Sequence, residues 1–251
     1  MAGLVPLALV AAFFVTALLY AAVGFGGGST YAALLALSGL DYRLLPLVAL
    51  ACNIVVVTGS SIRFARASIT PWRAAIILTA LAAPAAFLGG MTPISQSSFL
   101  LLLGASLLLT GVTMLLPIGQ GGDESPTRLA RLMPLAAAPL GYLAGLVGIG
   151  GGIFLAPLLH LTRWHNARAI AATASFFILV NSLFGLAGQL AKHGGGTFAG
   201  AVYESLPLLL AVAVGGQLGS LFAARLFPPR IIRWLTAALV IWVGARLLLG
   251  L

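Results

Sequence analysis

The chain carries very little charge for its length. Charged residues make up 7% of its 251 positions and hydrophobic residues 61%, whereas about a quarter of the residues in a soluble domain are charged. Acidic residues are the scarcest: Asp41, Asp123, Glu124 and Glu204 are the only four, and none lies in the middle of a long apolar run. This composition excludes a soluble globular protein. It also excludes a membrane site that binds Na⁺ or relays protons through an internal carboxylate.

Cysteine is nearly absent, because Cys52 stands alone. A single cysteine forms neither a disulfide framework nor a cysteine-based metal site. An intramembrane enzyme would need a nucleophile with a base, or a cluster of acidic metal ligands, and no such arrangement is evident in the sequence. An enzyme is therefore a remote alternative, and we expect no cofactor and no metal.

The sequence does contain eight long apolar runs. Six have about the 20 residues that one helix needs to cross a membrane, whereas the first and fifth are much longer and contain glycine breaks. The one clear linker, Pro117–Arg131, separates two similar halves, residues 1–116 and 132–251. The runs are Leu4–Leu40, Leu44–Phe64, Ala74–Met91, Phe99–Leu116, Leu132–Leu161, Ala169–Leu190, Leu206–Leu226 and Ile231–Leu249.

The two halves look like copies of each other. Each has its glycine break in its first run and an asparagine in the middle of its second. Paired glycine breaks in the halves of a membrane protein indicate a transport site, because unwound backbone survives in lipid only when buried or lining a wet cavity. The matching positions are Gly24 with Gly148, Gly26–Gly28 with Gly150–Gly152, and Asn53 with Asn181.

The basic residues indicate how the halves are oriented. Twelve Arg and one Lys lie singly or in small groups between apolar runs, which is typical of topology signals rather than of a nucleic-acid interface. If each broken run enters the membrane and returns to its own side, ten basic residues share the side of the linker. Only Arg43, Lys192 and Arg246 lie opposite. The asymmetry predicts inverted repeats, with both termini outside and a cytoplasmic linker.

We therefore expect an all-α polytopic membrane protein. Each of its two inverted repeats should contain a glycine-broken, re-entrant-like helix pair and three spanning helices. The segments after the breaks, Ser29–Leu40 and Ile153–Leu161, are too short to cross a hydrocarbon core about 30 Å thick. Each break should accordingly lie near the middle of the membrane.

The glycine breaks are the candidate substrate site. A short helix that starts in the membrane presents free backbone N–H groups and the positive end of its dipole, which suits a small anion. Isolated glycine pairs, such as Gly89-Gly90 and Gly215-Gly216, are expected only to let helices pack closely. The predicted binding residues are Gly26, Gly27, Gly28, Ser29, Thr30, Asn53, Gly150, Gly151, Gly152, Ile153, Phe154 and Asn181.

Some of these candidates have a structural alternative. Asn53 and Asn181 could instead form hydrogen bonds between helices. His160, which closes the short helix after the second break, and Glu204 are weaker candidates for a proton or substrate role, because they lie near the ends of apolar segments.

The second break resembles the signature of a known family. Leu143–Leu159 is similar to the motif of the TauE/SafE sulfite-exporter family, Ala167–Ser175 resembles the stretch that follows it, and Gly24–Ser29 resembles the matching N-terminal motif. The sequence departs from the commoner pattern at Phe154 and Ala156, which leaves the choice of substrate open.

The resemblance implies a permease of the bacterial inner membrane for small sulfur-containing or organic anions, such as sulfite, sulfonates and sulfoacetate. The expected partners are this anion and the lipid bilayer, without nucleic acid, and a homodimer is one assembly that we consider. Alternating access is the expected mechanism. Export is favoured because the membrane potential drives anions outward without a coupling carboxylate. An anion channel and an uptake permease for the same anions are the alternatives.

Overall fold

The computed structural model describes residues 5–22, 25–115, 128–223 and 229–250, and every regular element in these ranges is helical. This confirms the expected all-α class. Gly24 and most of the predicted linker lie outside the described residues. The last linker residues belong to a short 3₁₀ segment, η1 (Arg128–Leu132).

The helices follow the apolar runs, and each glycine-broken run forms two helices. Among the described residues, α3, α4, α5 and α8 are long and apolar enough to cross a membrane. The first half contains α1 (Leu7–Ala22), α2 (Gly28–Leu37), α3 (Leu45–Arg66), α4 (Trp72–Met91) and α5 (Gln96–Leu115). The second contains α6 (Met133–Val147), α7 (Gly152–Leu161), α8 (Ala167–His193), α9 (Gly195–Glu204), α10 (Leu206–Leu218), the π-helical turn η2 (Gly219–Ala223) and α12 (Pro229–Leu249).

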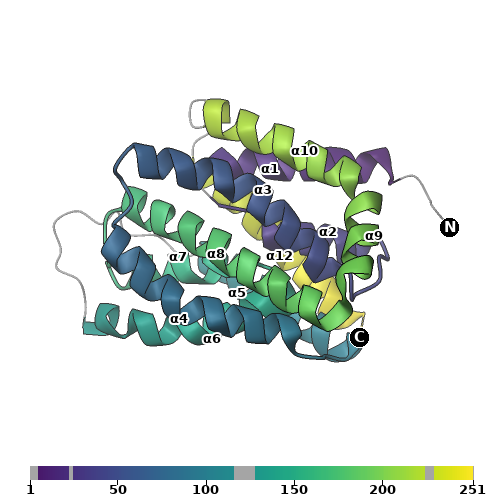
Figure 1. Ribbon diagram of the computed structural model, residues 1–251. Coiled ribbons are helices and arrows are strands. Elements are labelled where there is room, and N and C mark those ends of the chain that lie inside the picture. The colour runs from purple at the N-terminus through teal and green to yellow at the C-terminus, as the bar shows by residue number, and fades with distance from the viewer. Residues whose placement is uncertain (1–4, 23–24, 116–127, 224–228, 251) are drawn as a thin grey trace.

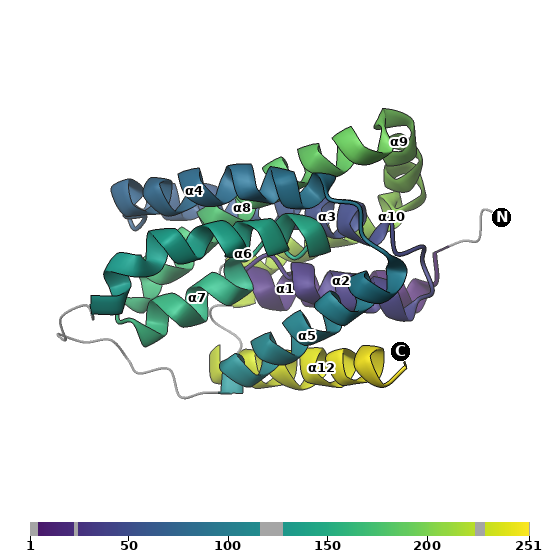
Figure 2. The same cartoon turned by 90° about the horizontal axis from the view of Figure 1, so that it is seen from below.

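Helices α3 and α8 lie side by side in the bundle and run in opposite directions (Figure 1). The turn after α3 and the start of α8 line one hollow, whereas the start of α3 and the end of α8 line another. Around this pair, α4 packs against α6 and α8, and α10 packs against α1 and α3. Helices α5 and α12 pack against each other along one side of the bundle (Figure 2).

Glycines bring the outer helices into direct backbone contact. Both α6 and the α10–η2 segment carry glycines four residues apart, the G-x-x-x-G spacing that lets membrane helices approach closely. A side chain at these positions would overlap the facing backbone, so the close packing expected of Gly215 is confirmed. The contacts join Gly141 and Gly145 of α6 to Ala82 and Ala86 of α4. They also join Gly215 of α10 and Gly219, the first residue of η2, to Phe14 and Leu18 of α1.

The outer surface of the bundle is strongly apolar. Leu88 of α4, Leu109 of α5, Leu210 of α10 and Trp242 of α12 are each more than half exposed. Contiguous apolar surface of this kind is rare on soluble monomers, but it is what lipid tails require of a membrane protein. The chain is a multi-pass membrane protein.

Helix α9 is not predicted by the sequence analysis, which places no element between the sixth and seventh runs. Its first turn contains Gly195 and Gly196, and glycine weakens the helix signal. Glu204 closes α9 and is exposed, so this carboxylate lies at the periphery of the bundle.

Candidate functional site

Each glycine break reverses the backbone through left-handed residues. Gly27 precedes α2 with φ of 81°, and Gly150 and Gly151 precede α7 with φ of 81° and 78°. Only glycine adopts this region without strain. Both breaks therefore share one design, a left-handed reversal followed at once by a helix of ten residues. We call residues 25–27 the first tip and residues 148–151 the second tip.

The two tips meet at Asn53 in α3. Its side chain is fully buried, and its Nδ2 donates a hydrogen bond of 3.1 Å to the carbonyl oxygen of Ile149 in the second tip. A Cβ atom at Gly26 would lie 2.5 Å from Oδ1 of Asn53, and one at Gly150 would lie 2.8 Å from Nδ2. Asn53 thus contacts both tips, and neither tip leaves room for a side chain beside it.

A small hollow lies between the tips. Its volume is about 10 Å³, close to the minimum that holds one water molecule. An anion of several heavy atoms therefore enters only if the tips separate. The lining residues are Tyr20, Phe25, Gly26, Gly27, Gly28, Ser29, Asn53, Ile149, Ile153 and Ile178.

Four buried polar atoms near the tips have no hydrogen-bond partner of good geometry within the described residues. They are Oγ of Ser29, the hydroxyl of Tyr31, Oδ1 of Asn53 and Oγ of Ser182. The Ser182 hydroxyl faces the second tip, since a Cβ atom at Gly150 would lie 3.0 Å from its Oγ. A buried polar atom without a partner costs about 1–3 kcal/mol. A ligand that pairs with these atoms would recover that cost.

Thr30 differs from its neighbour Ser29. Its hydroxyl forms a hydrogen bond of 2.8 Å with the hydroxyl of Tyr20 on α1. Both groups are buried, so this bond ties the start of α2 to α1 rather than leaving a free hydroxyl at the hollow.

Both short helices start at the tips. The N–H of Tyr31 bonds back to the Gly27 carbonyl at 3.0 Å, and the N–H groups of Phe154 and Leu155 both bond back to the Gly151 carbonyl at 3.1 Å. The amides before these have no acceptor within their own helix. Together with the positive ends of two helix dipoles, they make the region electropositive without a basic side chain.

In α8, the residue beside the second tip is Ile178 rather than Asn181. A Cβ atom at Gly150 would lie 2.9 Å from the Ile178 side chain, which also lines the hollow. Asn181 is fully buried, and neither atom of its amide has a hydrogen-bond partner among the described residues. Because three- and four-residue spacings share a helix face, Asn181 and Ser182 lie on the same side of α8 as Ile178.

Three other predicted residues lie away from the hollow. Phe154 is 7% exposed and packs in the apolar core. His160 is partly exposed and lies eight residues after the start of α7, roughly 12 Å along the helix axis. Glu204 is exposed at the end of α9. The structure therefore does not bring His160 or Glu204 to the tips.

Sequence reasoning missed Tyr20, Ile178 and Ser182. Tyr20 precedes the first break by about one helical turn, and Ser182 follows Asn181 directly, so each had a weak local signal. Ile178 had none, because an isoleucine within an apolar run does not stand out.

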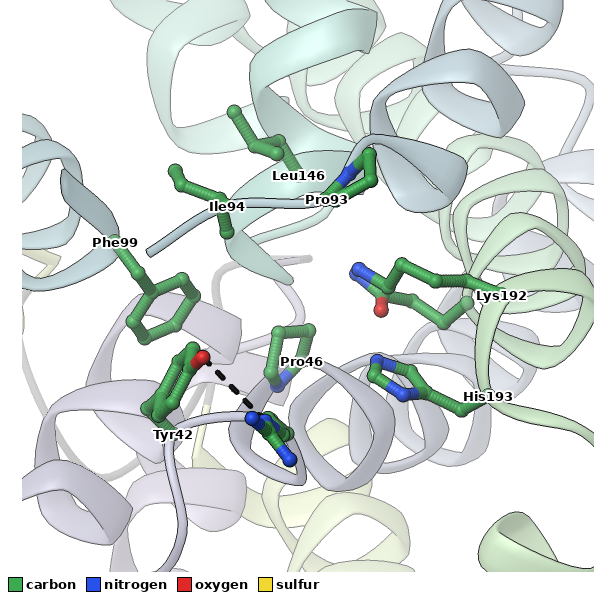
Figure 3. A pocket seen from close by; sticks show the side chains of 10 residues that line it. Tyr42, Pro46, Pro93, Ile94, Phe99, Leu146, Lys192 and His193 are labelled. Carbon is green, nitrogen blue, oxygen red and sulfur yellow. Dashed lines mark hydrogen bonds between the residues drawn. The ribbon is translucent and has the colours of Figure 1, made fainter. Parts of the chain in front are cut away.

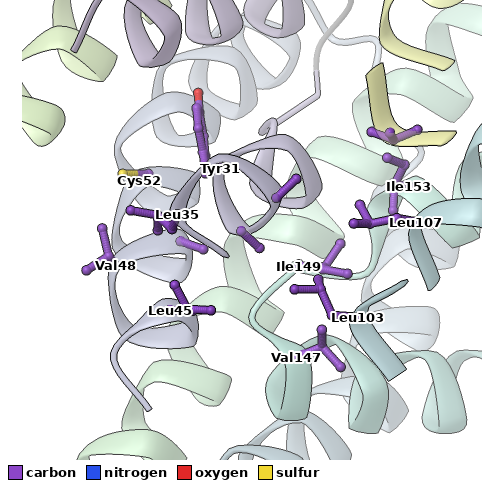
Figure 4. Packing of buried hydrophobic residues seen from close by; sticks show 14 of the residues in the cluster. Tyr31, Leu35, Leu45, Val48, Cys52, Leu103, Leu107, Val147, Ile149 and Ile153 are labelled. Atoms are coloured by element: carbon purple, nitrogen blue, oxygen red, sulfur yellow. The ribbon is translucent and has the colours of Figure 1, made fainter. Parts of the chain in front are cut away.

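Apolar side chains surround the tips (Figure 4). Ile149 and Ile153 pack in one cluster with Leu103 and Leu107 of α5, and Val48 of α3 belongs to the same cluster. This packing excludes bulk water. Electrostatic interactions are stronger in such surroundings than in water, so the helix dipoles act with little screening.

Comparison with known proteins places the chain among membrane transporters. The family model described as Sulfite exporter TauE/SafE matches residues 9–247. A probable membrane transporter protein of Sinorhizobium fredii is 32% identical over 244 residues, which cover 94% of this chain and 96% of the relative. A probable membrane transporter protein of Methanocaldococcus jannaschii is 28% identical over 223 residues, which cover 84% and 82%. No solved structure matches the chain.

Proposed function

Because the chain belongs to the sulfite exporter TauE/SafE family of membrane transporters, we propose that it carries small sulfur-containing or organic anions across the bilayer. It is a transporter and not an enzyme. The proposed substrates are of the sulfite, sulfonate and sulfoacetate class. The proposed setting is the bacterial inner membrane, and the proposed direction is export.

The observation that carries this proposal is the meeting of two helix starts at one hollow. Helices α2 and α7 both begin there, Ser29 and Asn53 line the hollow, and the Ser182 hydroxyl lies beside the second tip. Helix N-termini attract negative charge, whereas no basic or acidic side chain lines the hollow. A site of this kind would bind a small anion weakly enough to release it, which transport requires.

The packing pattern supports two inverted repeats. Exchanging α1 with α6, α3 with α8 and α4 with α10 converts the contacts of α4 with α6 and α8 into those of α10 with α1 and α3. The pairs α2·α3 and α7·α8 correspond in the same way, as do α2·α12 and α7·α5. Equivalent helices α3 and α8 run in opposite directions (Figure 1), which is the relation expected of inverted repeats. The repeats of residues 1–116 and 132–251 exchange helices, because α4 packs on α6 and α8 and α10 packs on α1 and α3. The two moving units would then be α1, α2, α3 and α10 on one side and α4, α6, α7 and α8 on the other.

The small hollow fits an occluded conformation. Asn53 of the first half holds the Ile149 carbonyl of the second half, so the two halves are joined at the tips. Opening the hollow to either side must break this hydrogen bond. Alternating access follows if the repeats rock about the tips, with the bond open whenever the anion is bound or exchanging.

Export is the direction that the available groups support. The membrane potential drives one negative charge outward with about 2.3 kcal/mol per 100 mV. Uptake against it would need a coupled cation, and the lining of the hollow offers no carboxylate to bind one. On the positive-inside assignment, the cytoplasmic end is the one where Arg168 lies beside the turn after α3.

The test is transport by the purified protein in proteoliposomes. Radiolabelled sulfite, sulfoacetate, sulfate and lactate are measured with and without a membrane potential set by a K⁺ gradient. We expect saturable flux of at least one sulfur-containing anion, increased when the potential drives anions out of the protein's cytoplasmic side. Absence of flux for every anion would reject the function, and flux that never saturates would indicate a channel instead.

A further inference from the structure

A basic pocket of about 300 Å³ lies at the end of the bundle where α3 starts and α8 ends (Figure 3). Lys192 and His193 approach it from α8, and Tyr42 and Phe99 line the opposite side. Arg43 also lines it, so two cations and an imidazole share one hollow. The two carboxylates nearest in sequence to these groups are Asp41 and Glu204. Only Asp41 is close, and it accepts a hydrogen bond from the backbone N–H of Arg43 rather than from its guanidinium.

The hydrogen bonds of the two cations go to uncharged oxygens. Lys192 Nζ donates to the Thr92 carbonyl at 3.3 Å, and Arg43 Nε donates to the Tyr42 hydroxyl at 3.4 Å. The Tyr42 hydrogen bond, with a smaller contribution from the Asp41 carboxylate, raises the pKa of Arg43 above its usual value, and arginine is charged at neutral pH in any case. Asp41 offsets part of this charge, so the two cations leave the pocket a net positive charge for an anion from solution.

This charge is notable because basic residues are scarce at this end. The sequence places only Arg43, Lys192 and Arg246 on the side opposite the linker. The positive-inside rule gives no reason for these residues to lie together. Two of the three nevertheless line one hollow, although they are about 150 residues apart in the sequence. Concentration of charge in a concave site focuses the local field and raises the rate at which oppositely charged solutes arrive.

The inner wall of the pocket lies against the second tip. Pro46 and Leu146 line the pocket, and a Cβ atom at Gly148 would lie 2.5 Å from Cα of Pro46. Ile149, whose carbonyl holds Asn53, follows Gly148 directly. Asn53 itself lies seven residues beyond Pro46 on α3, roughly 10 Å along the helix. A movement that displaces Gly148 from Pro46 would therefore join the pocket to the hollow between the tips.

We propose that this pocket is a second anion-binding site, at which Arg43 and Lys192 hold the transported anion before or after it passes the tips. The proposal rests on the anion-transport function proposed above and adds a site that the glycine breaks do not contain. Gln189, which is fully buried and keeps an unpartnered Oε1, lies between the pocket and α6, where its Nε2 bonds the Gly145 carbonyl.

The first experiment measures the field in the pocket without requiring transport. Ile94 lines the pocket, so an Ile94→Cys variant is labelled with anionic and with cationic methanethiosulfonate reagents. Cys52 is fully buried, and the parent protein gives the background. Relative to their rates with a small thiol in solution, we expect the anionic reagent to be favoured about tenfold over the cationic one. Adding Arg43→Gln and Lys192→Gln should remove this preference, whereas adding Arg246→Gln should keep it.

Arg246→Gln is a matched control, because it removes the same charge from the same predicted side. Arg246 lies over the Trp242 ring on α12, with 5.5 Å between Cζ and the ring centroid, and it is not part of the pocket lining. Equal reaction rates of the two reagents in Ile94→Cys, each taken relative to a small thiol in solution, would overturn the proposal. A preference that the Arg43 and Lys192 changes leave intact would overturn it as well.

The second experiment measures transport kinetics with sulfoacetate presented to the pocket side. Arg43→Gln with Lys192→Gln should raise KM about tenfold, the effect of losing about 1.4 kcal/mol of binding, with Vmax within about twofold. Arg246→Gln should change neither. If the parent protein transports no anion, only the proposed function is rejected. The labelling preference then still tests whether the pocket binds anions. Normal transport with an unchanged KM in the double variant would reject the pocket alone.

Discussion

The two tips end in the same way and differ in their surroundings. Both begin a ten-residue helix after a left-handed glycine. The neighbour of the first tip from the adjacent long helix is the amide of Asn53, whereas the second tip meets that amide and also Ile178 and Ser182 of α8. The hydroxyls differ too, since Ser29 belongs to the short helix itself and Ser182 reaches the second tip from α8.

This difference separates what the fold requires from what the substrate requires. Left-handed glycines and free helix N-termini occur at both tips, so the dipoles and amides are the shared element. The side-chain amide occurs once and crosses from the first half to the Ile149 carbonyl of the second. One asymmetric hydrogen bond therefore joins two otherwise similar structures.

The largest expected effect comes from adding a side chain where the two tips meet. A Cβ atom at Gly28 would overlap Nδ2 of Asn53 and lie 2.7 Å from the Ile149 carbonyl oxygen. We expect Gly28→Ala to reduce transport about a hundredfold, because displacements of about 1 Å at a preorganised site have effects of this size. Proteoliposome flux is the measurement, and size-exclusion profiles report folding.

Gly196→Ala is the control for that change, since a Cβ atom there meets nothing within 4 Å. It should transport like the parent. Parental flux in a folded Gly28→Ala protein would mean that the meeting of the tips is not the transport site.

Gly151→Val extends the comparison to the second tip. There φ of 78° adds backbone strain to the crowding, so this variant should also lose transport.

The next largest effect tests whether the hydrogen bond from Asn53 makes the two halves unequal. Asn53→Leu preserves approximate volume but leaves the Ile149 carbonyl without its donor, at a cost of about 1–3 kcal/mol. We expect a loss of transport of about tenfold to a hundredfold by the conversion of 1.4 kcal/mol per factor of ten. Asn181→Leu should reduce transport by less than about threefold, because Asn181 makes no hydrogen bond in the described structure. Equal losses in the two variants would show that the halves contribute symmetric amides.

The tips were predictable because their chemistry is local. Three consecutive glycines in an apolar run have few explanations, and left-handed φ at Gly27, Gly150 and Gly151 supplies the physical one. The helical class and the positions of most helices follow equally from apolar runs of membrane length. These features depend on residues close together in sequence.

The neighbours of the tips were not predictable, because they depend on how α8 is rotated against α7. The buried side of α8 is broad and carries both polar and apolar residues, so the sequence does not say which of them lies against the second tip. The matched asparagines therefore suggested Asn181, whereas Ile178, three residues earlier, lies against the second tip. The basic pocket is harder still, since Arg43 and Lys192 meet only after the two halves have packed together.

The smallest expected effect comes from two adjacent hydroxyls. We expect the Ser29 hydroxyl to contact the anion and the Thr30 hydroxyl to stabilise the fold. Ser29 Oγ is buried at the hollow without a partner, whereas the Thr30 hydroxyl pairs with Tyr20 at 2.8 Å. Ser29→Ala should raise the KM for sulfite about fivefold, the equivalent of one hydrogen bond of about 1 kcal/mol, with no loss of thermal stability. Thr30→Val should do the reverse, lowering the unfolding temperature in detergent and leaving KM unchanged, because it removes the 2.8 Å hydrogen bond of the buried Tyr20 hydroxyl. If both variants change only stability, the hydroxyl at Ser29 does not contact the anion, and recognition belongs to the backbone amides and Asn53.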